Sequence, residues 1–66
     1  MNKLAEKRKN KNLTQQQLSE KSGVAVRSIR AYEQGSKELN KAQAITVYRL
    51  AKALKCKVDD LLDIEK

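Results

Sequence analysis

The stretch that decides the fold is Leu13–Ser36, LTQQQLSEKSGVAVRSIRAYEQGS. It begins with a complete helix-start signal, because Thr14 can cap the first turn and Gln17, three residues later, can close a capping box with it. Gly23 suits the left-handed conformation that commonly ends a helix. The pattern predicts a helix of about two turns ending near Ser22, which is too short to be stable without tertiary packing.

A second short helix is predicted after this turn, over about Val26–Gln34, with Gly35 at its end. At 100° per residue, Ile29 marks its inner face, and Arg27 and Arg30 fall on the opposite side. Two short helices joined by a tight glycine turn form a helix-turn-helix, here over about residues 14–35. The residues expected to fill the wedge between the two helices are Leu18, Val24, Ile29 and Tyr32.

Three further segments have helical periodicity, and no segment alternates like a strand. The first is expected over about Lys3–Asn10. Another opens at Asn40, which repeats the capping-box spacing with Gln43, and runs to about Leu54. A short last helix begins near Val58. The sequence therefore predicts a single all-α domain of five helices over residues 1–66.

The charge of the chain is strongly basic and unevenly distributed. There are 15 Lys and Arg against eight Asp and Glu, which gives a formal charge of +7. The balance is +10 up to Val58 and −3 over the last eight residues. Such a basic body attracts polyanions, of which nucleic acid is the commonest in a cytosol. Lysine-rich solvation of a small domain explains the charge equally well, so charge alone does not decide the function.

The composition argues against several other classes of protein. Histidine is absent and Cys56 is the single cysteine, so neither a metal site nor a Cys–His catalytic pair is expected. The carboxylates fall at helix starts or solvated positions, so we expect neither an enzyme nor a cofactor. No apolar run approaches the roughly 18 residues of a membrane span, and no signal peptide begins the chain. We therefore expect a cytoplasmic protein that does not bind membranes.

The combination of TQQQL, SGV and YEQG, followed by LAKALKCKVDDLL at Leu50–Leu62, resembles the phage repressor and Cro family, the Xre-type regulators. The resemblance extends from Leu4 to about Leu62. It implies a five-helix, lambda repressor-like DNA-binding domain that forms a homodimer and lays the second helix of the motif in the major groove of double-stranded DNA. We expect a sequence-specific regulator acting on a near-palindromic operator. The small size favours a repressor with no small-molecule effector within this chain.

The resemblance also assigns DNA contacts to individual residues. Those expected to contact bases are Val26, Arg27, Arg30 and Ala31. Arginine can donate two hydrogen bonds to guanine, and small apolar side chains can touch the thymine methyl group. Those expected to contact phosphates are Gln15, Lys37 and Lys41. Gln15 stands at a helix N-terminus, where free N–H groups and the helix dipole favour an anion.

One charged pair is expected to be structural. Glu33 falls on the inner side of its helix beside Ile29, where an unpaired carboxylate would be costly. Arg8 shares a face with Leu4 on the first helix, and the family pairs an arginine and a glutamate at these positions. We therefore expect an Arg8–Glu33 ion pair that ties the first helix to the third.

Three positions depart from the family pattern and lower the expected stability. Ala25 stands where Ser or Thr usually caps the recognition helix, and Ser22 stands where an apolar residue is usual. Lys55 occupies the position after the fourth helix that normally takes glycine.

Ile45 and Tyr48 fall outside the inner stripe of the fourth helix, and two interpretations remain open. Ile45 could pack on the connection around Leu39, or the two residues could form a dimer seam with Ile64. The alternative function is an antitoxin-like or other protein-binding module whose main partner is a protein. Tight binding of such a partner through the fourth and fifth helices would indicate it.

Overall fold

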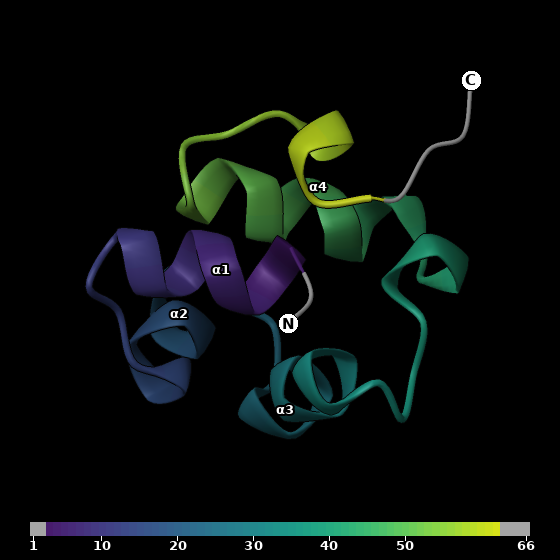
Figure 1. Ribbon diagram of the computed structural model, residues 1–66, viewed down its shortest axis with the longest axis horizontal. Helices are drawn as coiled ribbons and strands as arrows, with labels where there is room; N and C mark the ends of the chain where they lie inside the picture. Colours follow the sequence, from purple (N-terminus) through teal and green to yellow (C-terminus); the bar gives the residue numbers. More distant parts are fainter. Residues whose placement is uncertain (1–2, 63–66) are drawn as a thin grey trace.

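The computed structural model describes residues 3–62, which contain helices and turns but no strand. The elements are α1 (Lys3–Asn10), α2 (Gln15–Ser22), α3 (Val26–Gln34), η1 (Leu39–Lys41), α4 (Ala44–Ala53) and η2 (Val58–Asp60), where η1 and η2 are single 3₁₀ turns. In Figure 1, α1 crosses the middle of the view, with α4 and η2 on one side of it and α2 and α3 on the other. The all-helical prediction is confirmed.

The core is one apolar cluster to which every α-helix contributes. Its most buried side chains are Leu4, Leu18, Ile29, Leu50 and Leu54. Val24 and Leu61 are also buried in it, and Tyr32 packs against it while half-buried. The four residues expected to fill the wedge of the motif therefore all belong to the core or its edge. This packing holds helices that are individually too short to be stable in water.

α2 begins and ends where the sequence predicts. The hydroxyl of Thr14 accepts a hydrogen bond from the Gln17 N–H at 3.0 Å, and the Gln17 side chain accepts one from the Thr14 N–H at 2.8 Å. At the other end Gly23 is left-handed, with φ +76°, and its N–H donates to the Ser19 carbonyl. Both ends of this helix are thus fixed by local hydrogen bonds.

α3 has the predicted bounds but only one closed end. Gly35 is left-handed, with φ +86°, whereas Ala25 at the start makes no capping hydrogen bond. The missing cap is the one expected from the sequence. Ser22, just before the turn, is buried, and its hydroxyl accepts a hydrogen bond from the Val24 N–H at 3.1 Å. Its polar atom is therefore satisfied despite its unusual position.

The start of the fourth helix differs from the prediction. Asn40 does not open it but lies within η1, and α4 begins only at Ala44. Gln43 occupies the N-cap position without a side-chain capping bond. Leu39 packs half-buried against the core, so the chain around it forms a 3₁₀ turn before α4 can start. Tertiary packing here overrides a local capping signal.

The expected fifth helix is a single 3₁₀ turn, so residues 3–62 contain four α-helices and not five. The Asp60 carboxylate accepts a hydrogen bond from the Lys57 N–H at 3.0 Å, and the Leu61 N–H donates to the Val58 carbonyl. This turn is enough to bury Leu61 in the core. The expected position of Ile64 lies outside the described residues.

The end of α4 is built on a left-handed lysine, at the position that normally takes glycine. Lys55 has φ +54°, a conformation that residues other than glycine and asparagine rarely adopt. It lets the Cys56 N–H reach back to the Ala51 carbonyl at 3.0 Å, which closes the helix end as a Schellman-type motif. Cys56 itself is half-buried.

Candidate nucleic-acid interface

The outward face of α3 presents two arginines. Arg27 and Arg30 are exposed and three residues apart, so they are neighbours on one helix face. Within residues 3–62 neither guanidinium takes part in an ion pair or a side-chain hydrogen bond. Val26 and Ala31 lie half-buried beside them. The four residues expected to contact bases therefore reach the surface on one helix, with both cationic groups available to a partner.

The N-terminus of α2 presents free backbone donors. The capping box satisfies the N–H groups of Thr14 and Gln17. The N–H groups of Gln15 and Gln16 make no hydrogen bond within the described part of the chain. Two adjacent donors at the positive end of a helix dipole are well suited to bind a phosphate.

Beneath these donors lies the ion pair expected between Arg8 and Glu33. Arg8 Nε donates to Glu33 Oε2 at 2.6 Å and Nη2 donates to Oε1 at 2.9 Å, in the two-pronged arrangement that gives the strongest carboxylate contacts. The two side chains are only 12% and 7% exposed. The third guanidinium nitrogen, Nη1, donates to the Leu13 carbonyl at 2.7 Å. One arginine thus joins α1, the entry to α2, and α3.

The pKa values of this pair follow from the contacts. The pKa of Arg8 is raised, mainly by its hydrogen bonds to Glu33, although burial opposes the shift. Burial raises the pKa of Glu33, but hydrogen bonds from Arg8 and Gln15 and the charge of Arg8 together outweigh it, and the pKa lies below its ordinary value. Both groups are therefore charged at neutral pH.

Gln15 is tied to the same carboxylate, which the sequence did not indicate. Its side-chain Nε2 donates to Glu33 Oε1 at 3.1 Å, and the residue is half-buried. From the sequence, Gln15 was expected at the surface and Glu33 inside, with no link between them. The helical wheel does place Glu33 at the edge of the inner face, near Val26, and this was the only signal that a residue on α2 could reach it.

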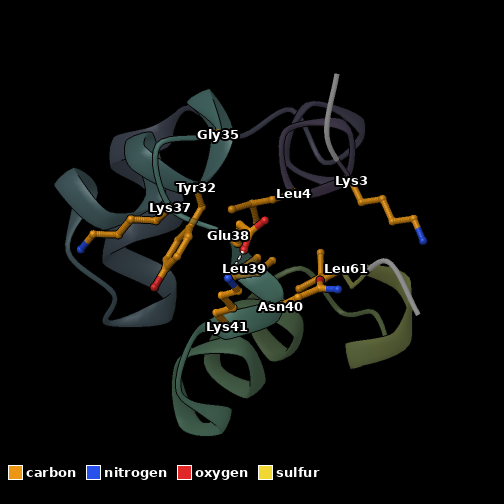
Figure 2. Close-up of a pocket in the computed structure, with 10 residues that line it drawn as sticks. All are labelled: Lys3, Leu4, Tyr32, Gly35, Lys37, Glu38, Leu39, Asn40, Lys41 and Leu61. Atoms are coloured by element: carbon orange, nitrogen blue, oxygen red, sulfur yellow. Dashed lines mark ion pairs between the residues drawn. The ribbon is translucent and has the colours of Figure 1, made fainter. Parts of the chain in front are cut away.

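The two lysines expected to contact phosphates lie on the connection from α3 to α4. Both are exposed, and Lys41 Nζ lies 3.0 Å from Glu38 Oε2 in a pair that solvent screens. Both line a hollow of about 630 Å³ between the end of α3 and η1. In Figure 2 the Lys37 side chain extends away from Leu4 and Leu61. Lys37 has no side-chain partner in residues 3–62, whereas Lys41 would have to exchange Glu38 for a phosphate.

Other kinds of site find little support. No group of three or more potential metal ligands occurs among residues 3–62, and no helix there is long and apolar enough to cross a membrane. Burial raises the pKa of the Cys56 thiol, and Asp60 adds to the effect, whereas Lys7 and Lys11 oppose it. The thiol is therefore protonated at neutral pH and is not an activated nucleophile.

Comparison with known proteins identifies the family. A family model described as helix-turn-helix matches residues 4–61, which include the motif, the Arg8–Glu33 pair and the whole apolar cluster. No curated protein and no solved structure matches the chain significantly.

Proposed function

Because the chain belongs to the helix-turn-helix family of phage repressor and Cro type, whose members are DNA-binding regulators, we propose that it is a sequence-specific transcriptional repressor acting on double-stranded DNA. The observation that carries this proposal is the outward face of α3. Two exposed arginines without protein partners stand there, beside the free N–H groups at the start of α2.

In the proposed complex, α3 lies in the major groove and reads base edges. Arg27 and Arg30 each donate two hydrogen bonds to O6 and N7 of a guanine. Val26 and Ala31, which are half-buried and carry only methyl groups, contact thymine methyl groups. Base contacts of this kind carry the sequence preference.

Phosphate contacts fix the position of α3 in the groove. The proposed phosphate ligands are the backbone N–H and the side chain of Gln15 together with Lys37 and Lys41. These contacts are independent of sequence and weaken with added salt, because each neutralised phosphate releases counterions.

We further propose that the protein binds a near-palindromic operator as a homodimer, with half-sites about one helical turn apart. Ile45 and Tyr48, which are 52% and 53% exposed, are the large apolar side chains exposed among residues 3–62. Lying three residues apart on α4, they share one face and support a seam between two copies. Their exposure also argues against the interpretation in which Ile45 packs on the connection around Leu39.

Selection from random duplex DNA, followed by binding measurements, tests this function. Arg27→Ala should relax the preference at one base position, at about 1–3 kcal/mol, and Arg30→Ala should do so at another. Arg49→Ala is the matched control and should leave the base preference unchanged, because Arg49 is an exposed arginine on α4 and not on α3. Failure of the wild-type protein to bind any duplex at low ionic strength would contradict the proposal.

The exposed pair on α4 also favours the second candidate function, a module whose main partner is a different protein. The two candidates differ in what Tyr48→Lys does. Loss of self-association together with weaker operator binding supports the homodimer. A wild-type protein that remains monomeric on its operator at high concentration supports the alternative.

A further inference from the structure

The contact between Gln15 and Glu33 links the ion pair to the proposed DNA interface. We infer that Glu33 is a positioning residue for DNA binding: it holds the side-chain amide of Gln15 at the start of α2, so that the second N–H of that amide can donate to a phosphate. This inference rests on the proposed function and gives Glu33 a role in DNA binding, although Glu33 does not itself touch DNA.

The first step of the argument is geometric. Gln15 is the first residue of α2, and its own N–H has no partner in the described residues. Its Nε2 carries two hydrogens, of which one is donated to Glu33 Oε1 at 3.1 Å. The other hydrogen remains for a ligand. Fixing the amide beside the helix N-terminus lets side-chain and backbone donors of one residue serve the same phosphate.

The second step concerns where the anchoring carboxylate lies. On α3, Glu33 and Arg30 are three residues apart and are neighbours on the helix surface. Arg30 is exposed, whereas the Glu33 side chain is 7% exposed. The amide of Gln15 is therefore held at the edge between the buried side of α3 and the side that faces the groove.

The third step concerns charge. A carboxylate close to a DNA phosphate would by itself repel it and weaken binding. Glu33 avoids this because both of its oxygens accept hydrogen bonds from Arg8, at 2.6 and 2.9 Å. The buried guanidinium offsets the negative charge and leaves the carboxylate as a rigid acceptor.

The fourth step is entropic. A free glutamine side chain has several rotatable bonds, and fixing such a side chain on binding lowers affinity. In this protein the amide is already tethered before DNA arrives. The hydrogen bond to Glu33 therefore raises DNA affinity by preorganising the Gln15 amide, without adding a contact to the DNA.

A purely structural role is the competing explanation. Within residues 3–62, no buried side-chain nitrogen or oxygen lacks a hydrogen-bond partner, and Gln15 contributes to that balance by donating to Glu33. If the hydrogen bond from Gln15 served only to satisfy Glu33, replacing Gln15 would alter stability and leave DNA affinity unchanged. Positioning instead predicts a loss of DNA affinity on replacing either residue 15 or residue 33, with no further loss when both are replaced. The two roles can therefore be separated by measuring DNA affinity.

The experiment is a double-mutant cycle on binding to a short duplex of mixed sequence at low salt. The variants are Gln15→Ala, Glu33→Gln and the double variant. Gln43→Ala and Glu38→Gln are the controls, since they make the same chemical changes at exposed positions of the connection from α3 to α4. All are measured at a temperature at which circular dichroism shows each variant to be folded.

Positioning predicts that Gln15→Ala and Glu33→Gln each weaken binding about tenfold and that the double variant is no weaker than either alone. Gln43→Ala should leave affinity within about twofold, and Glu38→Gln should not weaken it, because it removes a negative charge. Additive effects of the two changes would overturn the inference while leaving the proposed function intact. If the wild-type protein ignores the duplex, the proposed function fails instead.

A second measurement keeps the inference testable if Glu33→Gln does not fold. In the NMR spectrum of the free wild-type protein, the Gln15 side-chain amide should show one proton shifted away from the values of exposed glutamines such as Gln16. A further shift of the other proton should appear when duplex is added. Gln15 amide signals indistinguishable from those of Gln16 would overturn the inference.

Discussion

α2 and α3 are nearly equal in length, with eight and nine residues, yet their starts are held differently. α2 opens with a complete capping box, whereas α3 opens at Ala25, which supplies no side-chain acceptor. α3 is instead held along its inner side, by Ile29 in the core and Glu33 in the ion pair. In the free protein, the donors at the start of α2 are therefore already in place, while the first turn of α3 depends on packing further along the helix.

The largest expected effect comes from removing the inner anchor of α3. Glu33→Ala leaves Arg8 buried without its carboxylate, and the loss of one partner of a buried pair costs about 3–5 kcal/mol. Chemical denaturation near neutral pH measures this as a drop in the free energy of unfolding. Glu38→Ala, which breaks an exposed pair, should change it far less. Equal midpoints for the two variants would contradict this account of α3.

A smaller loss is expected when α2 is deprived of its cap. Thr14→Ala removes the acceptor of the Gln17 N–H and should lower the free energy of unfolding by about 1 kcal/mol. The same denaturation experiment measures it, with Gln16→Ala as the control at an exposed neighbouring position. After this change neither α2 nor α3 has a side-chain cap at its start. A variant as stable as the wild type would show that the cap of Thr14 does not stabilise α2.

The converse change adds a cap to α3. Ala25→Ser supplies the missing hydroxyl, and because residue 25 already has a non-helical conformation, with ψ 138°, stability should rise by roughly 0.5–1 kcal/mol. Amide hydrogen exchange should also slow in the first turn of α3. A stability no higher than that of the wild type would show that the start of α3 gains nothing from a cap.

The smallest expected effect is the dependence of the α3 anchor on pH. The pKa of Glu33 in the folded protein lies below its ordinary value of 4.5, so the ionised pair stabilises the fold above that value. This contribution is lost as the pH falls below 4.5 through the folded pKa. Stability curves for wild type and Glu33→Gln should therefore converge in acid. Curves of the free energy of unfolding that stay parallel down to pH 3 would contradict a lowered pKa for Glu33.

The parts of the fold that the sequence predicted are those encoded locally. The bounds of α2 and α3 follow from Thr14, Gln17 and two glycines, each of which acts on its own helix end. The Arg8–Glu33 pair was predictable because a carboxylate on an inner face needs a partner, and the resemblance to the phage repressor family pointed to Arg8.

The parts that failed depend on contacts that a local pattern does not contain. Asn40 and Gln43 have the spacing of a capping box, but the packing of Leu39 places Asn40 in a 3₁₀ turn. The expected fifth helix is only a single 3₁₀ turn, because one turn suffices to bury Leu61. The bond from Gln15 to Glu33 joins side chains of two helices, and neither periodicity nor spacing specifies such a rotamer.

The uneven charge has a consequence for how the molecule would meet a duplex. Asp59 and Asp60 lie in η2, which Figure 1 places across the molecule from α3, and no dimension of the molecule exceeds 32 Å. At physiological ionic strength the screening length is about 8 Å, so only the nearest side of the protein senses the phosphates. In dilute salt that length grows to about 30 Å, so the charges on the far side, including Asp59 and Asp60, act on the duplex as well. Diluting the salt should therefore let the charge of the whole molecule, and not only that of its near side, set the rate of the encounter.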